Sequence, residues 1–267
     1  MGIKNTLLAT ALLFASMQAA QAGTITDNYI GSDSHGYGDV ISSTALRSTY
    51  DISSAVVTRV GSILTIAIST GFAGKANTTG VPVGYGDLFL SNIWTPNTST
   101  AGYASDNMTN GTQWKYALSL NETNRLTNNA TNTATLYKLA GNSTSINSTK
   151  TVMDAAGIPS TDIYRDGQAD TVNKNSGSTA TLAKTTSGAT VTAGKMLIND
   201  ASDLVTFQID VAGTEMMNWT SFAIHWGETC QNDAIEGITS VVPEPGSVAL
   251  LGLGLFGLLA ARRRKMI

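Results

Sequence analysis

The sequence is built from short apolar runs rich in β-branched residues, separated by clusters of Gly, Asn, Ser and Thr, and its helical periodicity is weak throughout. Residues 56–60 and 63–69 flank Gly61-Ser62 and predict a β-hairpin. Further strands are expected at residues 88–94, 114–120, 133–139, 195–199, 204–212, 222–226 and 237–242. This pattern predicts an all-β fold, an antiparallel β-sandwich of jelly-roll or lectin-like kind, with a barrel as the alternative.

Hydrophobic residues make up 42% of the 267 residues, which is enough to build a core, and one domain is expected at this length. Residues 97–148 and 173–192 are rich in Asn, Ser and Thr and contain few large apolar side chains. Long surface loops are therefore expected in these two stretches. The single cysteine, Cys230, cannot form an internal disulfide, so the core must stabilise the fold alone.

The body of the chain is acidic. Five of the 16 Lys and Arg residues and one of the 19 Asp and Glu residues lie in the terminal segments, which leaves 11 basic against 18 acidic residues in the body. Nucleic acid is excluded as a partner because phosphate binding depends on clustered Lys and Arg. Cations, sugars and other proteins are the partners that this charge favours.

Residues 1–22 are typical of a secretory signal peptide. Lys4 supplies the positive charge, residues 7–15 are an apolar run, and Ala20-Gln21-Ala22 is a small-x-small cleavage site. Signal peptidase and the general secretion machinery are thus expected partners. The body is expected to span residues 23–242.

The opposite end carries a second apolar segment. Residues 246–261 contain no charge and would extend roughly 24 Å as a helix at about 1.5 Å per residue, which is just enough for a single transmembrane helix. The basic cluster Arg262, Arg263, Arg264 and Lys265 follows directly and predicts a stop-transfer signal on the cytoplasmic side. The body is then expected outside the inner membrane.

Pro243, Glu244 and Pro245 immediately precede this span. A Pro-Glu-Pro motif, a short Gly- and Leu-rich span and a C-terminal Arg cluster together resemble the PEP-CTERM sorting signal of Gram-negative bacteria, over residues 243–267. The resemblance implies recognition by an exosortase, transient attachment to the inner membrane, removal of the tail, and delivery to the cell surface or the extracellular polysaccharide matrix. An ordinary C-terminal membrane anchor is the alternative.

Two strings of four residues, Gly36-Tyr37-Gly38-Asp39 and Gly84-Tyr85-Gly86-Asp87, are identical. Together with residues 225–233 and Ile235-Glu236-Gly237, they resemble strings in the ectodomains of a subset of PEP-CTERM proteins. The resemblance implies a common architecture and no assigned chemistry.

No catalytic residue is predicted. His35 and His225 are the two histidines, and no GxSxG string accompanies them to supply a serine nucleophile. His225 and Cys230 are candidates for a thiol nucleophile or a metal pair, but zinc would require further ligands. A packed strand followed by a polar loop is the simpler interpretation of this segment.

No cofactor is expected, apart from a structural calcium ion. Calcium takes oxygen ligands from flexible loops. Asp162, Asp166 and Asp170 follow one another at four-residue spacing around Gly167, and Asp33 and Asp39 flank another Gly-rich loop. Neither loop matches the EF-hand pattern, and solvated turns are the alternative.

The sequence thus predicts a non-enzymatic exported protein that acts by binding or by a structural role. There are two alternatives: a carbohydrate-binding module and a hydrolase of matrix polysaccharide. Exposed Trp or Tyr side chains on one sheet face or at one end of the fold would favour the first. Two carboxyl groups within about 5 to 10 Å in a cleft would favour the second. We expect the four tryptophans to lie in the core rather than on an exposed surface that stacks on sugar rings: Trp94, Trp114, Trp219 and Trp226.

Overall fold

The computed structural model describes residues 21–31, 47–78, 82–159, 165–184, 187–189 and 194–241. The body forms one compact unit, Ala22–Val241. The sorting motif, the apolar span and the basic cluster lie outside the described residues, as do Ala20, Asp33, Asp39, His35 and Asp162. Ala22 lies within the first strand.

The described part of the body is composed mainly of strands. They are β1 (Gln21–Thr26), β2 (Ile52–Val60), β3 (Ile63–Thr70), β4 (Leu88–Ser91), β5 (Tyr116–Leu120), β6 (Thr131–Lys138), β7 (Ile146–Ser148), β8 (Ala169–Val172), β9 (Thr181–Leu182), β10 (Gly194–Asn199), β11 (Leu204–Asp210), β12 (Ser221–Gly227) and β13 (Ala234–Ser240). The helices are short: α2 (Arg47–Tyr50), α3 (Glu122–Arg125), α4 (Asn142–Ser145), α5 (Thr149–Ala155) and the 3₁₀ turns η1 (Ala101–Tyr103), η3 (Asp200–Ser202) and η4 (Glu215–Asn218). Every strand expected from the sequence has a counterpart, whereas β1, β7, β8 and β9 were not predicted.

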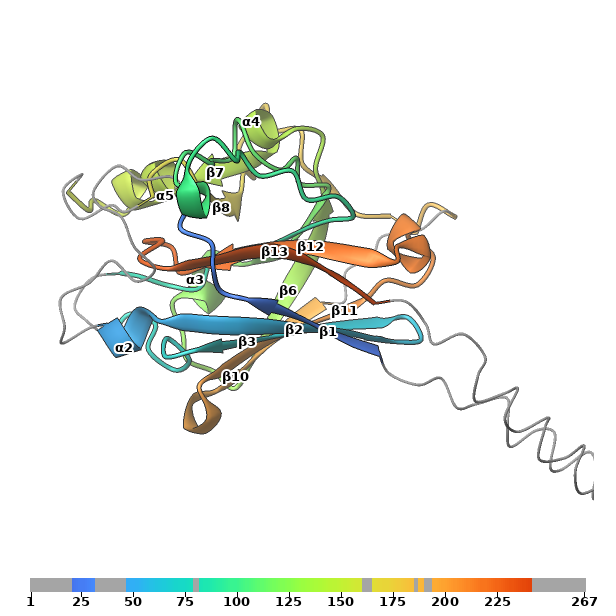
Figure 1. Cartoon of the computed structure of the whole chain (residues 1–267), viewed down its shortest axis with the longest axis horizontal. Helices are drawn as coiled ribbons and strands as arrows, with labels where there is room; N and C mark the ends of the chain where they lie inside the picture. Colours follow the sequence, from blue (N-terminus) through green and yellow to red (C-terminus); the bar gives the residue numbers. More distant parts are fainter. Residues whose placement is uncertain are drawn as a thin grey trace, which may run out of the picture. The chain divides into compact units, whose positions relative to one another are not determined.

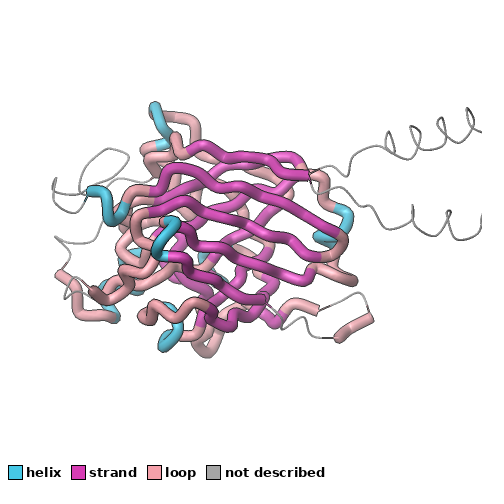
Figure 2. Tube along the Cα trace, turned by 90° about the horizontal axis from the view of Figure 1, so that it is seen from below, coloured by secondary structure: helices cyan, strands magenta, loops and turns pink. Residues whose placement is uncertain are grey.

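Most strands form one large antiparallel sheet in the order β1-β2-β3-β11-β10-β6-β5-β4-β12-β13, with β9 paired to β6. The sheet folds back on itself, so that β12 and β13 lie over β1, β2 and β3 (Figure 1). Figure 2 shows strands of one layer crossing those of the other. The structure thus confirms an all-β fold with a large antiparallel sheet, and this one sheet nearly closes into a barrel-like sandwich.

The two edges of this sheet touch where β1 crosses β13. A Cβ atom on Gly23 would lie 2.0 Å from the Thr239 hydroxyl oxygen, and one on Gly237 would lie 2.7 Å from a methyl carbon of Ile25. Because neither glycine has a side chain, the backbones can approach this closely. β1 therefore begins, and β13 ends, at the same end of the body (Figure 1).

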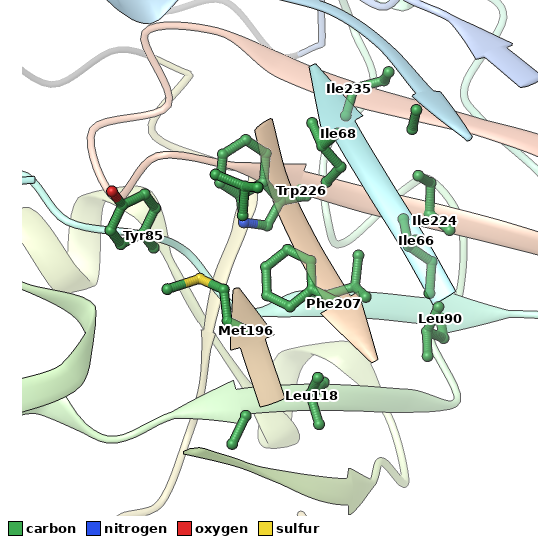
Figure 3. Packing of buried hydrophobic residues seen from close by; sticks show 14 of the residues in the cluster. Ile66, Ile68, Tyr85, Leu90, Leu118, Met196, Phe207, Ile224, Trp226 and Ile235 are labelled. Atoms are coloured by element: carbon green, nitrogen blue, oxygen red, sulfur yellow. The ribbon is translucent and has the colours of Figure 1, made fainter. Parts of the chain in front are cut away.

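The main core lies between the two layers of the sheet (Figure 3). Alternate residues of β3 and β11 are buried, as the period of two in a strand requires. Phe207 packs edge-on against Trp226, with ring centroids 6.2 Å apart. Trp114, Trp219 and Trp226 are all buried, which confirms a core position for three of the four tryptophans.

A smaller core covers the outer face of β4, β5 and β12, beneath β7 and β8. Figure 1 shows this added layer, with α4 and α5, above β12 and β13. It corrects the expectation of a long surface loop at residues 97–148, since Asn142 is buried here and its amide is fully used. Asn142 Oδ1 accepts from Trp114 N, while its Nδ2 donates to the carbonyls of Met108 and Thr112. A polar side chain that satisfies backbone groups in this way can replace an apolar one inside a fold.

Candidate functional site

Two strings singled out in the sequence meet in the fold. Gly86 N donates to Gly227 O (3.1 Å), Trp226 Nε1 donates to Gly86 O (3.2 Å), and Tyr85 forms a β-bridge with Glu228. Strand β8 packs onto this junction through a hydrogen bond from Asp87 N to Asp170 O (2.9 Å). The candidate site is built from these three segments, and the other Gly-Tyr-Gly-Asp string, at residues 36–39, lies outside the described residues.

Nine acidic and basic side chains are buried around this junction, each at most 5% exposed. Six are carboxyls and three are bases: Asp87, Asp106, Asp170, Glu228, Asp233 and Glu236 against Arg125, Arg165 and His225. They form three clusters of two carboxyls and one base, named here the Arg125, Arg165 and His225 clusters after their bases. Because burying an unpaired charge is costly, one carboxyl in each cluster must take up a proton or a cation.

In the Arg125 cluster, Asp87 forms an ion pair with Arg125. Its carboxylate accepts from Ser119 Oγ (2.6 Å), Leu120 N (2.9 Å), Val172 N (2.8 Å) and Arg125 Nη2 (3.1 Å). Both oxygens of Asp87 therefore have donors, and Arg125 is the charged partner of this carboxyl.

Asp170 is the second carboxyl of the Arg125 cluster, and it is fully buried. Neither of its oxygens has a hydrogen-bond partner in the described part of the chain. Burial raises the pKa of Asp170 well above its ordinary value; Arg125 opposes this rise, and the charge of Asp87 adds to it. Asp170 is thus the carboxyl that this cluster leaves unbalanced.

The Arg165 cluster closes the turn between β12 and β13. Arg165 Nη1 donates to the carbonyls of Gln231 (2.8 Å) and Asn232 (2.5 Å), and Nη2 lies 3.9 Å from Asp233 Oδ1. Asp233 Oδ2 also accepts from Ile52 N (2.7 Å), which ties the turn to the other layer. Burial, followed by the charge of Asp233, raises the pKa of Glu228 well above its ordinary value.

The His225 cluster lies on the outer face of β12 and β13. His225 Nε2 is 2.9 Å from Ala169 O, and because a carbonyl only accepts, this nitrogen carries a proton. His225 Nδ1 is 2.9 Å from Glu236 Oε2, while Glu236 Oε1 accepts from Trp94 Nε1 (2.8 Å). Glu236 therefore connects the imidazole ring of His225 to the indole of Trp94.

Asp106 completes the His225 cluster from the loop after β4. Its carboxylate accepts from Tyr29 OH (2.6 Å) and from Asn97 N (2.6 Å). Burial, followed by the charge of Glu236, raises the pKa of Asp106 to about 6, and the hydrogen bonds from Tyr29 and Asn97 oppose this rise. In the folded protein, Asp106 therefore titrates in the mildly acidic range.

The stability of the folded protein should depend on Asp106 between pH 4 and 6, near the ordinary and the raised pKa. In this window the folded state holds a proton that the unfolded state has lost, so stability falls as pH rises, by up to about 3 kcal/mol. Asp106→Asn should remove this part of the slope in urea unfolding measured from pH 4 to pH 7. Tyr29→Phe, which removes a hydrogen bond that lowers the pKa, should shift the slope to higher pH; an unchanged profile in Asp106→Asn would contradict the assignment.

The structure gives the positions of three further residues of the predicted sites: His225, Cys230 and Asp166. His225 faces the outer cluster whereas Cys230 belongs to the main core, so the two do not form a thiol–imidazole or metal pair. Asp166 is half-buried, and among the described residues no three His, Cys, Asp or Glu side chains come together as a metal site. The calcium prediction for Asp162, Asp166 and Asp170, and for Asp33 and Asp39, stays a prediction.

An open groove with a volume of about 480 Å³ borders the Arg125 cluster. It lies between α3 and α5, and its lining includes Arg125, Met153 and Lys174. Lys174 Nζ donates to Leu120 O (2.8 Å), so this lysine is attached to the end of β5. The groove could not be predicted from the sequence, because the helical periodicity of the segments that line it is weak.

A comparison with known protein families identifies the C-terminal segment of the chain. A model described as the PEP-CTERM protein-sorting motif matches residues 241–265. These residues are a PEP-CTERM sorting motif. A PEP-CTERM tail is typical of exosortase substrates and indicates an exported protein that is sorted at the cell envelope.

The PEP-CTERM match covers the tail and does not extend into the body. No curated protein and no solved structure matches the chain. Within the described residues, no helix is long and apolar enough to cross a membrane, and the span predicted at residues 246–261 lies outside them.

Proposed function

We propose that exosortase cleaves this protein at its PEP-CTERM motif and that the body then stays at the cell surface or in the extracellular polysaccharide matrix. There it acts without catalysis, by binding or by a structural role. The observation that carries the proposal is the position of the motif, which begins at Val241, directly after β13 ends at Ser240. A cut within Pro243-Glu244-Pro245 would leave every strand of the body intact.

The arrangement of the two ends of the body supports processing at a membrane. Gly23, the first residue after the predicted signal-peptide cleavage site, packs against Thr239 and Ser240 at the end of β13. Val241 is buried, and its N–H donates to Thr220 O (2.9 Å), which fixes the body up to the start of the motif. Signal peptidase and exosortase would then act on neighbouring points of the same body while it is attached to the inner membrane.

The buried carboxyls support a body without hydrolase activity. A glycoside hydrolase needs two carboxyl groups that flank a substrate in a cleft. Asp106 and Glu236 interact electrostatically, but they are 1% and 5% exposed and accept hydrogen bonds from Tyr29 and Trp94. This pair holds the outer layer on the sheet and has no access to a polysaccharide.

Carbohydrate binding is the second candidate, and Trp94 favours it. Trp94 is half-buried, its indole N–H is fixed by Glu236, and its ring meets that of the half-buried Tyr103 edge-on at 5.3 Å. Tyr103 has a φ of 60° and stacks on Tyr29, with centroids 6.0 Å apart. A rigid, partly exposed aromatic pair of this kind can stack on sugar rings.

The proposal is tested by fractionating matched hosts with and without exosortase. With exosortase, we expect the protein to lose its tail and to appear at the surface or in the matrix; without exosortase, it should stay full-length in the inner membrane. The same distribution in both hosts would contradict the proposal. Trp94→Ala tests carbohydrate binding separately. A variant that is cleaved normally but is no longer retained in the matrix would favour carbohydrate binding.

A further inference from the structure

Asp170 and Gln231 leave buried oxygen atoms without partners on the outer face of the sheet. Both side chains are fully buried, and both carboxylate oxygens of Asp170 and Oε1 of Gln231 lack hydrogen-bond donors in the described part of the chain. The amide of Gln231 is oriented by Nε2, which donates to Ala169 O (3.2 Å). Its free oxygen is therefore held close to the residue that precedes Asp170.

Gly86 and Gly227 lie next to these oxygens. A Cβ atom on Gly86 would lie 3.3 Å from Asp170 Oδ1, and one on Gly227 would lie 2.6 Å from Gln231 Oε1. The two glycines are themselves joined by the hydrogen bond from Gly86 N to Gly227 O. Asp170 Oδ1 thus lies next to Gly86, Gln231 Oε1 lies next to Gly227, and the two glycines are adjacent.

A further cation can neutralise the Asp170 carboxyl in place of a proton. Arg125 is the base of this cluster, and its guanidinium pairs with Asp87 at 3.1 Å and with Glu122 at 3.0 Å. Asp170 makes no ion pair of its own in the described part of the chain. A buried, unpaired carboxylate costs several kcal/mol, so the site favours a ligand that brings positive charge.

We propose that Asp170 and Gln231 bind a divalent cation with the ligand preference of calcium, above Gly86 and Gly227. Calcium accepts carboxylate, amide and backbone carbonyl oxygens together with water, so it does not require a third acidic side chain. The Asp170 carbonyl oxygen lies 3.5 Å from the same Cβ position on Gly86, so backbone oxygen is also at hand. This ligand set differs from the one predicted from the sequence, Asp162, Asp166 and Asp170.

The test measures calcium binding to the full chain in detergent after removal of metals with EDTA. Isothermal titration with CaCl₂ should show one site, and calcium should raise the Tm. Asp170→Asn should weaken binding at least tenfold. In EDTA this variant should melt no lower than the unmodified protein, because it removes an unbalanced buried charge; this comparison separates loss of binding from loss of folding.

Asp166→Asn is the matched control, since it changes the neighbouring half-buried carboxyl of the predicted loop and should retain the unmodified affinity. The proposal is overturned by an unmodified protein that binds no calcium, or by equal affinities in Asp170→Asn and the unmodified protein. Equal losses in Asp166→Asn and Asp170→Asn would overturn the ligand set, because they would assign the ion to the loop predicted from the sequence.

Discussion

Replacing Arg125 with methionine is expected to lower the free energy of unfolding by about 3 to 5 kcal/mol. The guanidinium is 3% exposed and donates to Asp87 Oδ1 and to the carbonyls of Tyr85 and Leu120. Its removal leaves Asp87 and Asp170 buried together without a base. Urea unfolding at neutral pH, monitored by tryptophan fluorescence, measures the loss.

Lys174→Met is the matched control for Arg125→Met, since Lys174 also donates to Leu120 O but its side chain is 35% exposed. An exposed cation of this kind contributes about 1 kcal/mol or less. The loss in Arg125→Met should also shrink in acid, because the two carboxyls it leaves behind can then be protonated. Losses of equal size in the two variants would show that Arg125 does not balance the buried carboxyls.

Replacing His225 with phenylalanine is expected to cost about 3 kcal/mol, although the ring fits an aromatic surrounding of Phe89 and Trp114. The cost arises because Glu236 loses its contact with His225 Nδ1 while it stays buried. Glu236→Gln should cost a similar amount, for it leaves His225 Nδ1 without a carboxylate.

A double-mutant cycle separates pairing from packing. If His225 and Glu236 form an ion pair, the double variant should be less destabilised than the sum of the single ones, with a coupling of about 1 to 3 kcal/mol. Additive losses measured by the same urea unfolding would mean that the two side chains act independently.

Much of the sheet could be predicted because its strands alternate. In β3, buried positions recur every second residue, and Gly61, at a φ of 59°, supplies the turn that joins it to β2. β7 and β8 could not be predicted, because they are short and polar and are buried only by contact with the main sheet. The sequence of a short segment does not indicate a contact with a strand that is distant in the chain.

The candidate site was predictable only in part. The strings at residues 84–87 and 225–233 carry a resemblance that the sequence shows, and they meet in the fold. Arg125 lies in a stretch rich in Asn and Thr that predicts a surface loop, and its partner Asp87 is 38 positions away. The pairing of each base with its carboxyls is set by the folding of the sheet, which the spacing of residues along the chain does not reveal.

Cleavage and release of the body by way of the PEP-CTERM motif are tested by the intact mass and cellular location of the protein in an exosortase-bearing host, with and without Pro243→Ala and Pro245→Ala. We expect the unmodified protein to lose its tail and leave the inner membrane, while the doubly substituted protein keeps its tail and stays there. Full-length protein in the membrane in both cases would rule out this role of the motif, and the tail would then be a plain anchor.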